Sequence, residues 1–191
     1  VYKRQREMPL YAHSTSYRDW VQAWTLWLIR SSRPGDAASL FHIFTSVVRD
    51  HDVGIAQYLL PHLVLHILIS GSSQQRRTVL GESLAVLADQ AHPALGYEPE
   101  RRRLTAQTLF HVLDHVGHWM RRMRLVPLRM ARRSRWRDAL SDVQAIMDEL
   151  SPDLLAQASL QCDAYARALL HFEYRIRAMR PQPCLLYTSP S

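Results

Sequence analysis

Residues 55–71 read IAQYLLPHLVLHILISG, the most apolar run of the sequence. Apolar side chains recur at almost every angle around a helical wheel of this segment, so no continuous polar face is left for solvent. The pattern excludes an amphipathic surface helix and predicts a helix buried on most sides. Pro61 removes one backbone donor and crowds the preceding turn, which predicts a bend near Tyr58. The residues expected to make its core contacts are Leu59, Leu60, Pro61, Leu63, Val64 and Leu68.

A membrane-spanning helix is the alternative interpretation of this segment. His62 and His66 interrupt the apolar run, which ends at Ser70 and Gly71. The continuous apolar part is therefore shorter than the roughly 18–20 residues that cross a bilayer. We expect a core helix and no membrane partner.

The two ends of the chain, residues 1–5 and 184–191, are similar to translated sequencing adapter. Codons can be chosen for VYKRQ at the start and CLLYT near the end that are nearly reverse complements of each other. Such segments are set aside before a fold is inferred. We expect residues 6–183 to form a single helical segment cut from a longer protein.

The composition predicts a folded domain with a sizeable core. Hydrophobic residues make up 47% of the 191 residues and only 6 are glycine, which excludes a disordered class. Between the two ends there are 22 arginines, no lysine and a single cysteine, Cys162. This thiol has no partner for an intramolecular disulfide. We therefore expect it to pack as a small buried hydrophobe in a reducing compartment.

The periodicity predicts an all-α fold. Sustained period-2 alternation is absent from the sequence, and turn residues separate long stretches with a period near 3.6. We expect about seven or eight helices stacked as irregular hairpins, an α-solenoid similar to tetratricopeptide or HEAT arrays. The expected helices cover residues 17–30, 36–49, 52–69, 73–89, 99–119, 138–150, 152–162 and 163–180.

Helix caps and large apolar residues add detail to this stack. The expected caps are Ser16 with Asp19, then Asp36, Ser151 before Pro152, and Asp163. In the last hairpin, small residues alternate with large ones across a short turn, as in tetratricopeptide-like pairs. The further residues expected in the core are Trp20, Trp24, Leu109, Leu113, Trp119, Ala158, Tyr165, Ala168, Leu169 and Phe172.

Arginines concentrate in residues 121–137, RRMRLVPLRMARRSRWR, which carry eight arginines, no acid and a proline at 127. Like charges and the proline predict a solvated basic connector between helices. The alternative function is a helical nucleic-acid-binding module that uses this stretch with residues 101–103. Outside the stretch the native part holds 14 arginines against 17 acids, which is close to neutral. Direct nucleic-acid binding is therefore not the expected role.

Histidines form two groups with helical spacing. His111, His115 and His118 lie on one helix face, and His62 and His66 form a second pair. Imidazoles at this spacing can share a zinc ion, but the sequence holds no HExxH motif and no cysteine pair. We expect these histidines to be hydrogen-bonded or solvent-facing, with no metal site.

The sequence lacks the parts of a kinase active site. It has no glycine-rich phosphate loop, no lysine except Lys3, and no HRD-like or DFG-like triplet. We expect no catalytic residue, no cofactor and no ATP binding. A Ser-His-Asp arrangement is not excluded by the sequence, although no nucleophile elbow is present.

Four segments in order, residues 17–21, 58–71, 107–119 and 158–173, resemble the helical FAT region of ATR-type phosphatidylinositol 3-kinase-related kinases, the DNA-damage checkpoint kinases. Residues 92–99 and 121–137 have no motif that can be matched. The resemblance implies a non-catalytic scaffold of paired helices that precedes the kinase domain of a large nuclear serine/threonine kinase. It also implies that the partners are the rest of the parent chain and a regulatory protein or second protomer.

Overall fold

The computed structural model describes residues 8–33, 35–50, 53–92, 98–125 and 133–179, so the adapter-like ends lie outside the described residues. Within these ranges all regular structure is helical, which confirms the all-α prediction. The helices are α1 (Leu10–His13), α2 (Tyr17–Ser31), α3 (Asp36–Ile43), α4 (Thr45–Asp50), α5 (Val53–Ser70), α6 (Ser73–Ala91), α7 (Pro99–Leu125), α8 (Arg133–Asp148), α9 (Pro152–Gln161) and α10 (Tyr165–Met179).

The described residues hold two helices more than expected. One is the short helix α1, which the sequence did not indicate. The other arises because the helix expected over 36–49 is interrupted at Phe44, whose N–H bonds the carbonyl only three residues back, on Phe41, at 3.1 Å. The first of these two helices begins at Asp36, so Gly35 and not Asp36 occupies the N-cap position.

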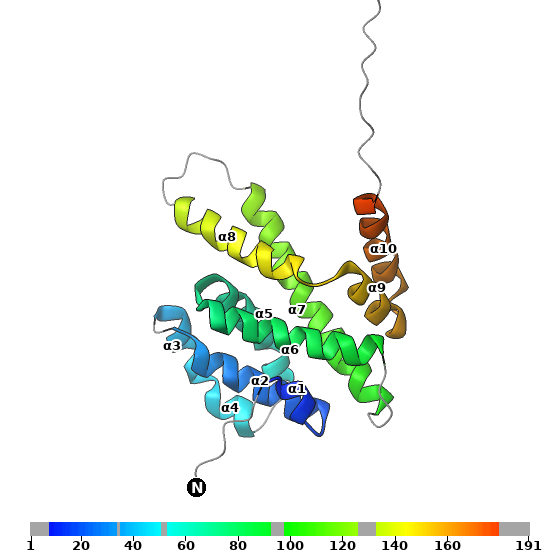
Figure 1. The fold of residues 1–191 in the computed structure, drawn as a ribbon. Helices are drawn as coiled ribbons and strands as arrows, with labels where there is room; N and C mark the ends of the chain where they lie inside the picture. Colours follow the sequence, from blue (N-terminus) through cyan, green and yellow to red (C-terminus); the bar gives the residue numbers. More distant parts are fainter. Residues whose placement is uncertain (1–7, 34, 51–52, 93–97, 126–132, 180–191) are drawn as a thin grey trace, which may run out of the picture.

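Helix α5 lies at the centre of the stack. It packs against α2 on one side and α7 on another, and it also contacts α8 (Figure 1). Its buried side chains are Ala56, Leu59, Leu60, Pro61, Leu63, Val64, Ile67 and Leu68. One flank stays open, because Tyr58 is 72% exposed and His62 is also exposed. Helix α5 is therefore enclosed on several sides but not on all of them.

Helix α5 is also the one described helix that is long and apolar enough to cross a membrane by length and composition. Its 18 residues have a mean hydropathy of 1.6, and 44% of them are buried inside the structure. Buried core helices meet the same criteria, so these numbers alone are weak evidence for a membrane span.

The other helices surround this centre as pairs. Helix α6 runs beside α7 and carries α9, and α9 pairs with α10 at one end of the molecule (Figure 1). Helices α1, α3 and α4 gather around α2 at the opposite end. The chain therefore progresses from one end to the other, as expected of stacked hairpins.

Two N-caps among the described residues have side-chain bonds, and both follow recognisable sequence patterns. Ser16 accepts from the N–H of Asp19 at 3.1 Å, as predicted. At the start of α6, Ser72 and Gln75 form a reciprocal capping box, which is the S-x-x-Q pattern. Ser151 precedes Pro152 as expected, although its side chain makes no cap bond.

Asp163 was predicted to cap the last helix, and this is wrong. It has a φ of 59° and ends α9 instead. Its N–H bonds the carbonyl of Leu160 at 3.1 Å, and the N–H of Ala164 bonds that of Ser159 at 2.9 Å. This pair of bonds is a Schellman motif, in which an aspartate tolerates the left-handed conformation better than most residues do.

The basic stretch is more helical than predicted. Helix α7 continues to Leu125 and α8 begins at Arg133, so both ends of the expected connector at 121–137 are helical. Arginine, methionine and leucine are good helix formers, and this local preference outweighs the clustering of like charges. Residues 126–132 lie outside the described residues.

Most of the expected core residues are buried. Those with less than a tenth of their surface exposed are Trp20, Trp24, Leu59, Leu60, Leu63, Val64, Leu68, Leu109, Ala158 and Ala168. Pro61 is buried as well, and Leu113, Trp119 and Phe172 are half-buried. Cys162 is also buried, and burial raises the pKa of its thiol to about 11, as befits a packed hydrophobe.

Tyr165 and Leu169 are not core residues, which corrects the prediction. They are 59% and 64% exposed. Helix α10 packs against α9, and the less exposed positions of α10 include Ala168, His171 and Arg175. Leu169 follows Ala168 by one residue, which is about 100° of rotation, and Tyr165 lies one turn before Leu169 on the same side of the helix. Both side chains therefore lie beside the face that packs on α9 and not within it.

The burial of Leu63 predicts a large effect of a charge at this position. Leu63→Asp places an unpaired carboxylate where the exposed fraction is 0%, so we expect a loss of several kcal/mol in the free energy of unfolding. Tyr58→Asp on the open flank of the same helix is the matched control, with an expected change of about 0.5 kcal/mol or less. Urea unfolding followed by circular dichroism measures both. Equal effects of the two substitutions would contradict the placement of α5.

Candidate functional site: polar joints between the helices

The two histidine groups of the sequence meet only in part. His62 on α5 and His115 on α7 lie edge to face, with ring centroids 4.6 Å apart. His66 turns elsewhere, toward the ring of Phe41 and the hydroxyl of Ser70. Among the described residues, no group of three or more histidine, cysteine or carboxylate side chains is placed to hold a metal ion.

The surroundings of His115 and His66 disfavour the charged form of each imidazole. Burial lowers the pKa of His115, and the nearby His62, His111 and His118 lower it further. Burial likewise lowers the pKa of His66. The rings of His62 and His115 pack edge to face at the α5–α7 seam, so this pair contributes packing between the two helices.

A buried carboxylate joins three helices. Glu82 on α6 has no exposed surface and accepts three hydrogen bonds. Two come from the first N–H groups of α1, on Leu10 at 2.6 Å and Tyr11 at 2.8 Å, and the third comes from the indole of Trp20 on α2 at 2.7 Å. Burial raises the pKa of Glu82, while these three donors act in the opposite direction. The start of α1 suits a carboxylate, because helix N-termini present unpaired N–H groups.

The short helix α1 is held by a second set of contacts. The hydroxyl of Tyr11 donates to Asp89 on α6 at 2.5 Å, and burial together with Asp89 raises its pKa. Arg101, at the start of α7, donates to the carbonyl of Tyr11 at 2.8 Å and lies 4.7 Å from the centre of its ring. Helix α1 thus links α6 to α7.

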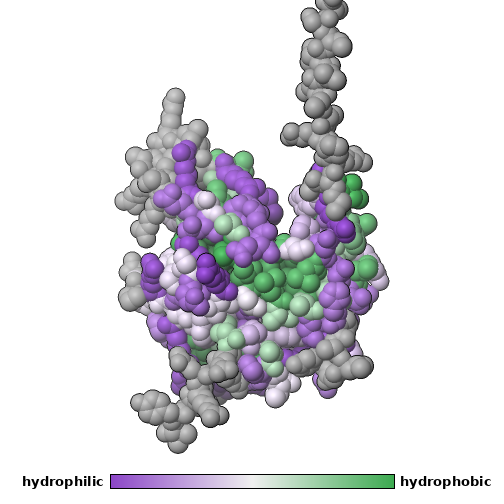
Figure 2. Space-filling model, in the orientation of Figure 1, coloured by the Kyte–Doolittle hydropathy of each residue, from purple (hydrophilic) through white to green (hydrophobic). Residues whose placement is uncertain are grey.

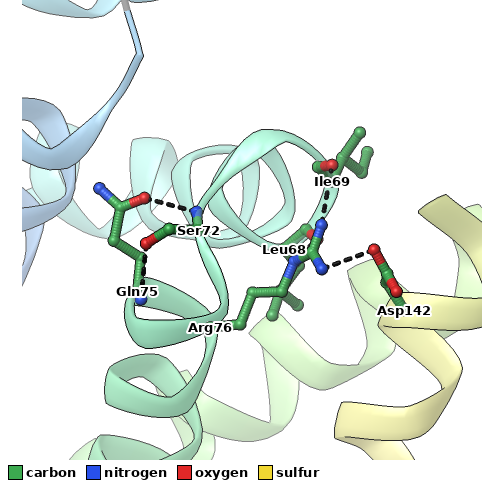
Figure 3. A network of polar contacts seen from close by, with 6 residues as sticks. All are labelled: Leu68, Ile69, Ser72, Gln75, Arg76 and Asp142. Atoms are coloured by element: carbon green, nitrogen blue, oxygen red, sulfur yellow. Dashed lines mark hydrogen bonds and ion pairs between the residues drawn. The ribbon is translucent and has the colours of Figure 1, made fainter.

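Arg76 forms a clamp at the other end of α6 (Figure 3). Its guanidinium donates to the carbonyls of Leu68 at 2.8 Å and Ile69 at 3.4 Å, both in the last turn of α5. It also pairs with Asp142 on α8 at 2.5 Å. One side chain therefore satisfies helix-end carbonyls and fixes α8 against the α5–α6 pair.

The terminal hairpin is held by ion pairs nearer to solvent. Arg167 on α10 makes two bonds to Asp114 on α7, at 2.8 Å and 2.5 Å, and its guanidinium lies 4.8 Å from the ring centre of Phe110. Arg175 pairs with Asp153 on α9 at 2.7 Å. Both pairs are partly exposed, so each contributes less than the buried Glu82 network.

The sequence contained a usable signal for one of these joints. Glu82 lies three residues after Val79 and four before Val86, so it shares the buried face of α6 with two core valines. Periodicity alone could have marked it as a buried acid. The partners of Arg76 and Arg167 lie 66 and 53 residues away in the chain, and no local pattern indicates them.

The described geometry supports a mechanical role. Every buried polar group discussed above bonds another part of the chain. No arrangement among the described residues resembles a phosphate-binding loop or a nucleophile with its base. The networks position helices with respect to one another, which is what a scaffold requires.

The Glu82 joint leads to a test. In Glu82→Gln the amide keeps one acceptor oxygen but turns an NH₂ group toward a backbone or indole N–H, so one buried donor loses its acceptor. We expect the free energy of unfolding to fall by about 1–3 kcal/mol. Glu149→Gln, at an exposed position, is the control and should change it by less than about 0.5 kcal/mol. Denaturant unfolding measures both, and an unchanged midpoint for Glu82→Gln would contradict a structural role for the network.

Comparison with known proteins gives a consistent family. The sequence matches the family model described as "Serine/threonine-protein kinase ATR, M-HEAT region" over residues 4–184. Among curated relatives, serine/threonine-protein kinase ATR of Oryza sativa subsp. indica is 28% identical over 195 residues, which cover 88% of this chain and 7% of that protein. Serine/threonine-protein kinase ATR of Arabidopsis thaliana is 28% identical over 197 residues, with the same coverage. Protein kinase rad3 of Schizosaccharomyces pombe is 26% identical over 184 residues, covering 88% of this chain and 8% of that kinase.

These matches confirm the kinase type but not the region first inferred. The chain spans less than a tenth of the length of these relatives. The matched region is the M-HEAT region, and the FAT assignment is not confirmed. No solved structure matches the chain. Since the family model covers nearly the whole sequence and the described residues form stacked helical pairs, the chain belongs to the M-HEAT region family of ATR-type serine/threonine-protein kinases.

Proposed function

We propose that the chain is a non-catalytic helical scaffold segment of an ATR-like serine/threonine kinase that acts in DNA-damage checkpoint signalling in the nucleus. The family match and the all-helical stack support the scaffold role. The signalling role and the nuclear location are proposals for the parent protein, and they follow from the resemblance to checkpoint kinases. The partners proposed are the rest of the parent chain and a regulatory protein or second protomer.

The observation that carries this proposal is how the polar joints are distributed. Glu82 fixes α1 and α2 to α6, and Arg76 fixes α8 to the α5–α6 pair. Both joints lock helices that are distant in sequence into one body. A body of this kind transmits displacement along its length, because packed helices shift as units and not side chain by side chain.

The proposal predicts that a broken joint changes regulation but not chemistry. In the full-length parent kinase, Arg76→Ala removes the link between α5, α6 and α8. We expect stimulated kinase activity to change by roughly fivefold, the order of a modest coupling free energy between sites, with the KM for ATP unchanged. The matched control is Arg77→Ala, at the neighbouring exposed position, which should leave stimulated activity as it is.

Two outcomes would contradict the scaffold role. One is that the 191-residue chain alone hydrolyses ATP or phosphorylates a peptide. The other is that Arg76→Ala changes the KM for ATP while stimulation stays intact, because that result would mean that this segment contributes to the ATP-binding site.

We also propose that direct nucleic-acid binding is not the role of the basic stretch. Arg124, within the stretch, is hydrogen-bonded to Gln144 on α8, so this arginine already serves an intramolecular contact. Helix α7 continues to Leu125 and α8 begins at Arg133, so the connector between the helices is shorter than the predicted range of 121–137.

The basic stretch therefore predicts weak binding to DNA. A fluorescent duplex titrated with the chain should show the same low affinity for unrelated sequences, and binding should vanish as salt approaches physiological concentration, because only phosphate contacts are available. Replacing Arg129, Arg132, Arg133 and Arg135 by glutamine should weaken this low-salt binding further, and by the same factor for every sequence. Tight binding at physiological salt that is lost in this variant would support the nucleic-acid module instead.

A further inference from the structure

The outer side of the terminal hairpin carries an unusual share of exposed apolar surface. Twelve large hydrophobic side chains are exposed among the described residues, and six of them lie between residues 160 and 176. They are Leu160, Tyr165, Leu169, Leu170, Tyr174 and Ile176. Figure 2 shows apolar surface along the edge of the molecule at α10, and a broader apolar area in the hollow between α8 and the α9–α10 hairpin. Apolar surface gathered in one place marks an interface more often than a solvated face.

Part of this surface forms a stripe with helical order. Tyr165, Leu169, Phe172 and Ile176 follow one another at i, i+4, i+7 and i+11, so they line one side of α10. The stripe spans about 16 Å at 1.5 Å per residue, three turns of helix. We call these four residues the α10 stripe. Its spacing and length suit the side of another helix lying along it.

The α10 stripe does not face the rest of the stack. Helix α10 packs against α9, and Arg167 ties it to Asp114 on α7. Three members of the stripe remain more than half exposed, at 59%, 64% and 52%, and Phe172 is half-buried. The hairpin therefore uses one side for the helices before it and leaves a second side open.

Charge around the α10 stripe disfavours an anionic partner. Arg175 is paired with Asp153 at 2.7 Å, Arg177 with Glu173 at 3.5 Å, and Arg167 with Asp114. These three described arginines of α10 each have an acidic partner within the chain. What the stripe offers is apolar surface between internally neutralised charges, which fits the apolar face of an amphipathic helix.

We propose that the α10 stripe is the docking face for the next helical hairpin of the same parent polypeptide, on the C-terminal side of this segment. The proposal rests on the proposed place of the chain in a longer kinase. Relatives at least ten times longer than the matched segment supply chain for the occupant, and the family is one of stacked helical pairs. In such stacks each hairpin buries one side against its predecessor and the other against its successor. The α9–α10 hairpin shows the first side buried against α6 and the second side bare.

Hydrogen–deuterium exchange of α10 tests the proposal. The 191-residue chain and the full-length parent kinase are compared at the same pH and temperature. We expect the backbone amides of residues 169–176 to exchange at least about tenfold more slowly in the parent, because a second packed face suppresses local opening. Equal exchange in the two proteins would overturn the proposal.

Substitutions within α10 provide the second arm. Leu169→Glu introduces a charge on the stripe, and Ala166→Glu introduces the same charge at an exposed position of the same helix. In the 191-residue chain both substitutions should leave the melting temperature within about 1–2 °C of that of the unsubstituted chain, since both sites face solvent. In the full-length kinase, Leu169→Glu should abolish the added protection of α10 while Ala166→Glu retains it. Loss of protection in both, or in neither, would overturn the proposal.

Sedimentation tests the alternative occupant of the α10 stripe, which is a second copy of the same chain. If a second copy covers the α10 stripe, the 191-residue chain should sediment as a dimer at micromolar concentration, and Leu169→Glu should return it to a monomer. That result would overturn the proposal. A monomeric chain whose α10 becomes protected only in the parent supports it. The proposed scaffold function is tested separately, by the stimulated kinase activity of Arg76→Ala. Failure of the docking proposal therefore does not imply failure of the proposed function, and the reverse also holds.

Discussion

The enclosure of α5 is the constraint on which the other helices depend. Its apolar residues cover three sides, and burying them stabilises the fold by about 25 cal/mol for each Å² removed from water. No single neighbour can cover three sides of a helix. Helices α2, α7 and α8, from parts of the chain before and after it, therefore gather around it. The flank with Tyr58 and His62 stays exposed, and it carries polar groups that tolerate water. At its edge the His115 ring packs edge to face against His62.

Apolar burial alone does not say how the surrounding helices are placed, because it is non-directional. Two helices with apolar faces can slide by a turn at small cost. Glu82 removes that freedom, since three donors at 2.6 to 2.8 Å cannot be satisfied in any shifted arrangement of α1 and α2. Arg76 does the same for α8, because its bonds to Leu68 and Ile69 exist only at the end of α5. Packing thus sets which helices meet, and the polar joints set their register.

This division explains what could be predicted from the sequence. The helices, the burial of Trp20 and Leu63 and the Ser16 cap follow from local periodicity and capping chemistry. The pairings between distant helices do not, because partners such as Arg76 and Asp142 lie 66 residues apart. Tyr165 was misassigned because apolar spacing marks a helix face as apolar but does not show whether the neighbouring helices cover it. The basic stretch was taken for a connector because like charge was weighted above helix propensity.

The joints also differ in strength along the stack, and this bears on how a scaffold of this kind moves. Near α1 and α2 they are buried and hydrogen-bonded, and removing one partner leaves an unsatisfied group in the core. At α10 they are partly exposed ion pairs such as Arg167 with Asp114, which contribute about 0–1 kcal/mol each. Helix α9 remains anchored by small residues such as Ala158 and Ser159, which are fully buried. Helix α10 is held to the body mainly through α9 and the Arg167–Asp114 pair, and its outer apolar face adds nothing to that hold within the described residues. A displacement that reaches this end would first be taken up by α10, while the α5-centred body moves as one unit.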